Sequence, residues 1–224
     1  MDIEEYRKQF IDELRFNAEH EGTEPETQFI EKYLSDLEEI GELNDPIPMS
    51  VEMRGSRNRL LAFDAYAYDE ADGALILIAS DFTNERDSTP TLTNSHIEDI
   101  YTHMLNFLDE CVQGNISKYC DDSDPALIIA NEFRKKIGKG LLSTEILRFK
   151  FFILSNATLS KQVKNLSKPE FLGRPVELNV WTLELFYQTF ASNSSDIIEI
   201  DTTDFGCDGI QCLKADIGVD SEYD

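Results

Sequence analysis

The chain has 224 residues, 41% of them hydrophobic and 10% aromatic, and carries 44 acidic against 20 basic residues, a formal net charge of −24. This apolar content is enough for a packed core and excludes wholesale disorder. The charge disfavours nucleic acid as a ligand unless basic residues cluster, because such binding depends on neutralising phosphates. A solvated acidic surface explains the charge most simply. The alternative is an acidic face that docks a basic partner or mimics DNA.

The termini and the cysteines bear on location. The first ten residues, MDIEEYRKQF, lack the basic stretch and apolar run of a signal peptide, and no window approaches the about 20 apolar residues of a membrane span. The four cysteines, Cys111, Cys120, Cys207 and Cys212, lack metal-site spacing. We therefore expect a cytoplasmic protein with reduced thiols and no membrane contact.

Two helices are expected at the start of the chain. The first covers about 3–19, with apolar residues on one face. The second begins at a predicted capping box, Thr23 with Glu26, and its apolar residues from Phe29 to Ile40 recur at helical spacing. Asn44-Asp45-Pro46 ends it.

Three strands are expected next, at 47–53, 59–68 and 74–82. The Asp72-Gly73 pair before the apolar run ALILIASDF indicates a hairpin between the last two, and the continuous run indicates a strand buried on both faces. A second predicted capping box, Ser95 with Glu98, starts a helix that reaches Cys111.

The remaining elements are a helix at 125–137, strands at 145–154 and 175–180, a helix at 181–190, and a terminal hairpin from 197–200 and 210–213. This order predicts an α/β (α+β) fold, a mixed central sheet flanked by helices. We divide the chain into a helical pair at 1–45 that packs on the sheet, an α/β core at 46–192, and a hairpin with the start of a linker at 193–224. The expected core includes Phe29, Leu34, Leu37, Leu75, Leu77, Phe151, Ile153 and Trp181.

Two acids in adjacent predicted strands are the main candidates for chemistry. Strand alternation places Asp64 on one side with Tyr66 and Tyr68, and Asp81 at the end of the next strand. An acid within an apolar strand is costly unless it is paired or binds metal. If the two faces match, Asp64 and Asp81 could share a cation such as Mg²⁺. The alternative is that Asp64 caps a strand or pairs with Arg54, Arg57 or Arg59.

Several segments resemble the amino-terminal region of abortive-infection phage-resistance proteins. They are Leu60–Phe82, the helix from Asn94, the phrase FFILSN at 151–156 and the phrase VWTL at 180–183. The resemblance implies a role in bacterial defence against phage and a larger carboxy-terminal region, absent here, as a partner of this domain. The final residues lack a core-closing signal, so we expect a truncated chain.

The resemblance also implies a restriction-endonuclease-like fold, with an Asp on one strand and a (D/E/Q)-x-K pair on the next. In such a site the acids bind Mg²⁺ and the lysine assists the attacking water. Asp64 matches the first position, but Ala79 and Asp81 stand where the acid and the lysine are expected. Glu26 or Glu31 could supply an acid. In place of the lysine, the sequence offers only Arg54, Arg57, Arg59 and Arg86.

One basic cluster follows the helix at 125–137, and its members are Arg134, Lys135, Lys136 and Lys139. It is either a solvated helix end favoured by the dipole or a phosphate contact. Three functions therefore compete: a recognition or interaction domain on a degenerate nuclease fold, an active Mg²⁺-dependent nuclease, and a structural module that binds a protein partner or forms a homodimer.

Overall fold

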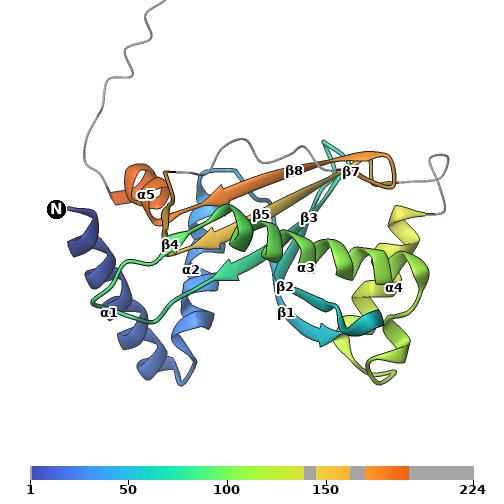
Figure 1. Ribbon diagram of the computed structural model, residues 1–224, viewed down its shortest axis with the longest axis horizontal. Helices are drawn as coiled ribbons and strands as arrows, with labels where there is room; N and C mark the ends of the chain where they lie inside the picture. Colours follow the sequence, from blue (N-terminus) through green and yellow to red (C-terminus); the bar gives the residue numbers. More distant parts are fainter. Residues whose placement is uncertain (1, 139–144, 162–169, 192–224) are drawn as a thin grey trace, which may run out of the picture. The chain divides into compact units, whose positions relative to one another are not determined.

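The computed structural model describes residues 2–138, 145–161 and 170–191, which lie in one compact unit, Met1–Ala191 (Figure 1). The predicted terminal hairpin, Cys207 and Cys212 lie outside the described residues. The helices are α1 Ile3–Glu21, α2 Pro25–Glu39, α3 Asn94–Gln113, α4 Pro125–Ile137 and α5 Leu183–Phe186, with 3₁₀ turns η1 Ser56–Asn58 and η2 Ile116–Lys118 and the π-helical turn η3 Tyr187–Ala191. The strands are β1 Ile47–Arg54, β2 Leu60–Asp69, β3 Ala74–Asp81, β4 Thr91–Leu92, β5 Arg148–Ser155, β6 Thr158–Leu159, β7 Glu170–Phe171 and β8 Arg174–Trp181.

The predicted mixed sheet is confirmed. Six strands lie in the order β1-β2-β3-β5-β8-β7, and a second sheet pairs β4 with β6. The strands β1, β2 and β3 form an antiparallel meander, and β5 and β8 continue it in parallel. The helices α3 and α4 form the crossover from β3 to β5, as a parallel connection requires.

The two faces of the sheet bury separate apolar cores. Along β3, Ile76 and Ile78 point to one face, where they pack with residues of α1, α2 and α5. Leu75, Leu77 and Ala79 point to the other, where they pack with α3 and α4. Figure 1 shows α3 crossing its face of the sheet along much of its length. Every residue of the expected core is buried: Phe29, Leu34, Leu37, Leu75, Leu77, Phe151, Ile153 and Trp181.

Both predicted capping boxes are wrong. The N-cap of α2 is Glu24, whose side chain makes no capping hydrogen bond, and Pro25 opens the helix. Proline at this position removes one of the free amides of the first turn, and its fixed φ suits the start of a helix. The N-cap of α3 is Thr93 rather than Ser95, and its hydroxyl accepts from the amide of His96.

The elements beyond β3 differ from prediction mainly at their ends. The strand expected at 145–154 begins at Arg148, and the helix expected at 181–190 is α5 followed by η3, because Trp181 ends β8 and Thr182 caps α5. The short strands β4, β6 and β7 were not predicted. None of the helices in the described residues is long and apolar enough to cross a membrane.

A buried arginine holds the segment after β3 against α1. The Arg7 guanidinium donates to the carbonyls of Thr83 (3.2 Å), Glu85 (2.6 Å), Ser88 (2.6 Å) and Asn156 (3.1 Å). Asn156, fully buried, completes the junction, since its side chain accepts from the Thr83 amide and donates to the Thr83 carbonyl. This clamp fixes the chain where β3 and β5 end, beside the predicted site.

Candidate functional site

Asp64 lies where β2 and β3 separate. Ladder pairing of the two strands begins at Ala65 with Ile78, whereas β3 continues to Asp81 beside β5. The Ser80 amide is therefore left without a β2 carbonyl, and an unpaired buried amide is costly. The Asp64 carboxylate supplies the acceptor, at 2.7 Å from the Ser80 amide and 2.9 Å from its hydroxyl. The strand-capping interpretation of Asp64 is confirmed.

The arginine partners considered for Asp64 are not the ones it uses. Its other oxygen accepts from the Ser50 hydroxyl at 3.3 Å. Arg59 instead binds Asp109 and Glu110, and Arg54 donates to the Asn58 carbonyl at 3.3 Å. Asp64 is thus satisfied by neutral donors of two neighbouring strands.

Burial, with a smaller contribution from a nearby carboxylate, opposes the ionisation of Asp64, so its pKa is raised overall. Burial raises its pKa, hydrogen bonds from Ser80 and Ser50 lower it, and the charge of Glu52 raises it. The pKa of Glu26, at the start of α2, is raised by burial and by the charges of Asp64 and Glu52, and lowered by a hydrogen bond with Ser80. The acid that the second helix brings to Asp64 is therefore Glu26.

Asp81 belongs to the opposite face of the sheet. Its carboxylate accepts from Ser155 Oγ at 2.7 Å and lies 2.9 Å from His96 Nε2, on α3. Ser80, one residue earlier, points toward α2 and binds Asp64. The structure therefore does not bring Asp64 and Asp81 together: each carboxylate has its own partners on its own face.

The predicted side of Asp64 is wrong for a specific reason. Phe63 and Tyr66 both join the core under α3, although they are three residues apart, while Ala65 and Ala67 join the core under α1 and α2. Strict alternation would place residues three apart on opposite faces. The alternation of β2 therefore breaks between Phe63 and Tyr66, beside an irregularity in its pairing with β1.

The same geometry changes which β3 residues share the side of Asp64. Ala79 packs in the core under α3, and Asp81 contacts α3. The residues on the Asp64 side are Ser80 and Phe82, and Phe82 packs against Phe29 of α2 with ring centroids 5.1 Å apart. Neither residue is an acid or a lysine. No group of three or more His, Cys, Asp or Glu side chains in the described parts of the chain is placed to hold a metal ion.

The basic cluster is dispersed where it is described. Lys136 Nζ lies 3.3 Å from Glu145 and 4.4 Å above the Tyr68 ring, so its charge is engaged. Lys135 is exposed, and Arg134 packs so close to Gly114 that a Cβ there would lie 2.5 Å from its guanidinium. Lys139 lies outside the described residues. The phosphate contact stays a prediction.

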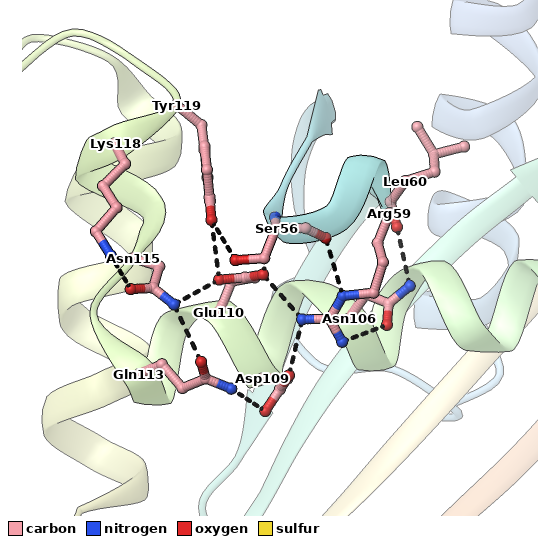
Figure 2. A network of polar contacts seen from close by, with 10 residues as sticks. All are labelled: Ser56, Arg59, Leu60, Asn106, Asp109, Glu110, Gln113, Asn115, Lys118 and Tyr119. Atoms are coloured by element: carbon pink, nitrogen blue, oxygen red, sulfur yellow. Dashed lines mark hydrogen bonds and ion pairs between the residues drawn. The ribbon is translucent and has the colours of Figure 1, made fainter.

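A buried polar network centred on Glu110 was not predicted (Figure 2). The Glu110 carboxylate, fully buried on α3, accepts from Arg59 at 2.8 Å, the Ser56 amide at 3.1 Å and Asn115 at 2.8 Å. Burial opposes its ionisation, but these donors outweigh burial and lower its pKa to about 2. The network joins the β1–β2 turn to the end of α3. The sequence signal was an acid between Phe107 and Cys111 on the apolar side of the helix.

The comparisons with known proteins give a family. A family model described as the abortive infection phage resistance protein N-terminal domain matches residues 29–188. No curated protein and no solved structure matches the chain. The match begins within α2, ends within η3, and contains Asp64 and the complete six-stranded sheet. Because it covers more than half of the sequence, the chain belongs to the abortive-infection phage-resistance protein N-terminal domain family.

Proposed function

We propose that this phage-defence domain is a recognition or interaction domain built on a restriction-endonuclease-like fold whose nuclease site is degenerate. The arrangement of elements supports the fold: a helix, a three-stranded antiparallel meander, a helical crossover and a strand parallel to the third. Asp64, on the second strand, is the residue that the resemblance assigns to the Asp position of such a nuclease site.

The use of the Asp64 carboxylate carries the proposal. It caps the Ser80 amide, and its side of the sheet holds Ser80, near the end of β3, and Phe82, just after β3. Neither residue is an acid or a lysine, so the Asp64 side of this segment supplies neither a second carboxylate nor a cation to steady an attacking water. Glu26 and Glu52 add negative charge, which repels a phosphate.

The alternative hypothesis is an active nuclease in which Asp64 and Asp81 share one Mg²⁺ ion. The positions of the two side chains do not fit this arrangement. The carboxylates lie on opposite faces of the sheet, and hydrogen bonds from Ser80 and Ser155 occupy them. Two carboxylates that point to different faces cannot converge on one ion.

The test of the degenerate site is cleavage by the 224-residue chain of plasmid DNA and single-stranded RNA with Mg²⁺ or Mn²⁺. We expect no cleavage. Asp64→Asn and Asp64→Ala are run beside the parent, since Asn keeps an acceptor for the Ser80 amide and separates chemistry from folding. Metal-dependent cleavage by the parent that both variants lose would show an active nuclease and overturn the proposal.

A second experiment tests the role in defence. In the full-length protein, we expect Asp64→Asn to preserve protection against phage, because an interaction domain does not depend on a catalytic carboxylate. Deletion of residues 29–188 should abolish protection. Loss of protection in a folded Asp64→Asn protein would contradict the proposed role.

A further inference from the structure

The strand β1 forms one end of the six-stranded sheet, and β2 is its strand partner in the part of the chain that the structure describes. The two halves of β1 differ. Its pairing with β2 shifts between Pro48 and Val51, whereas Val51–Arg54 pairs with β2 in continuous register. The outer edge of this regular half therefore offers a straight row of backbone donors and acceptors, a template for another strand.

The hydrogen-bond pattern identifies the residues that face outward. The Gly55 amide donates to the Arg59 carbonyl at 2.9 Å, so Gly55 turns its backbone groups toward β2. In an antiparallel ladder this direction alternates with each residue. Met53 and Val51 therefore also bond toward β2, and Glu52 and Arg54 direct their amide and carbonyl groups to the free edge.

We propose that the β1 edge pairs with the β1 edge of a second copy of this chain, antiparallel about a two-fold axis at Met53. In this register Glu52 of each copy lies opposite Arg54 of the other. Each of these two pairs exchanges two backbone hydrogen bonds and brings opposite charges together. Both side chains are exposed, and the Arg54 guanidinium has further N–H donors beside the one that binds the Asn58 carbonyl at 3.3 Å.

Charge selects this register among those that the backbone allows. An axis at Glu52 would place two carboxylates directly opposite each other, and an axis at Arg54 would place two guanidinium groups opposite each other, both unfavourable. An axis at Val51 would need the irregular segment after Pro48. The axis at Met53 alone combines a regular ladder with two Glu–Arg pairs.

The side chains around the axis fit the pairing. Met53 is half-buried and packs at the margin of the core under α3, so two copies of Met53 would meet there and exclude water. On the other face, Glu52 adds to the negative charge near Asp64 and Glu26. Arg54 of the second copy would offset that charge. Two-fold pairing occupies the β1 edge of both copies, so growth through this contact stops at the dimer.

Sedimentation equilibrium of the 224-residue chain tests the proposal over a range of protein concentration, at about 0.15 M salt to screen the −24 charge. We expect a concentration-dependent dimer. Glu52→Arg and Arg54→Glu should each raise the dimer Kd about tenfold, since each turns two attractive pairs into repulsive ones. The double variant that carries both changes should restore the wild-type Kd. Glu19→Arg, an exposed change of the same charge on α1, is the matched control and should not weaken the dimer.

A disulfide tests the register independently of charge. Opposite residues of a non-hydrogen-bonded pair have Cα atoms about 4.5 Å apart, within the range of a disulfide. Met53→Cys should therefore form a covalent dimer on oxidation, beyond any formed by wild type through its own four cysteines. A chain that stays monomeric, a dimer indifferent to both charge reversals, or a dimer that Met53→Cys does not cross-link would each overturn the proposal. Circular dichroism of every variant confirms that it is folded.

Discussion

At the residue scale, Glu110 makes the sharpest prediction. Its pKa of about 2 lies below the ordinary value of 4.5, so its stabilising contribution is complete above pH 4.5 and is lost as the pH falls toward 2. We expect Glu110→Gln to lower the free energy of unfolding by about 3 kcal/mol at pH 7 and by much less near pH 3. Urea unfolding of both proteins at the two pH values measures this difference.

Asp109 provides the control for that prediction. It also binds Arg59, at 3.0 Å, but its side chain is 36% exposed. Asp109→Asn should therefore cost under about 1 kcal/mol at pH 7, as exposed ion pairs do. Equal losses for the two variants, or a Glu110→Gln loss that persists near pH 3, would contradict the assignment.

The same residues show how far sequence reasoning reaches at this scale. That Asp64 needs a partner follows from its place in an apolar strand, and strand capping was among the predicted answers. The identity of the partner was not predictable, because the Ser80 amide becomes free only where β2 and β3 separate. The role of Glu110 was not predictable for a similar reason. Its partners Ser56 and Arg59 lie more than 50 residues away in the sequence and meet it only in the fold.

At the element scale, the Arg7 clamp predicts how α1 is attached. Arg7→Met keeps an apolar stem but leaves four carbonyl oxygens without their donor, those of Thr83, Glu85, Ser88 and Asn156. We expect a loss of about 3 kcal/mol or more in the free energy of unfolding, because charged hydrogen bonds are lost from a buried site. Urea unfolding measures this loss, and limited proteolysis should show faster cleavage within 83–90.

Lys8→Met is the matched control. Lys8 is the half-buried neighbour of Arg7 on α1, and its replacement also removes one positive charge. Its effect should be small. If Arg7→Met and Lys8→Met cost the same, or if 83–90 is no more accessible in the Arg7 variant, the clamp does not hold this segment.

Elements with a strong period were predictable, and those set by tertiary contacts were not. The helix at 125–137 and the hairpin of β2 and β3 follow from spacing and from the Asp72-Gly73 turn. The two-residue strands β4, β6 and β7 are too short to show a period. The break in alternation within β2 depends on how β1 pairs with it, so the side of Asp64 could not be assigned from the sequence.

At the scale of the whole molecule, the chain has a large acidic excess, and several of the basic side chains in its described residues are already engaged. Arg7 is buried among carbonyls, Arg59 binds Asp109 and Glu110, and Lys150 lies between Asp69 and Asp72. The surface excess is therefore negative, in keeping with the −24 charge. This balance makes self-repulsion among the acids a term in the stability of the compact state.

That repulsion predicts that salt stabilises the fold. Raising NaCl from about 0.01 M to about 1 M shortens the Debye length from about 30 Å to about 3 Å, which screens repulsion among acids at distances typical of a folded surface. In the unfolded chain the acids lie farther apart, so salt removes less repulsion there than in the folded state. The same salt weakens exposed ion pairs such as Arg86 with Asp12, but each is worth only about 0.2–1 kcal/mol. We therefore expect the free energy of unfolding, measured with urea, to rise with NaCl.

A double variant, Glu19→Lys with Glu39→Lys, changes two exposed acids and should show a smaller rise. Stability that falls with NaCl would mean that ion pairs, rather than net charge, dominate the electrostatics of this domain.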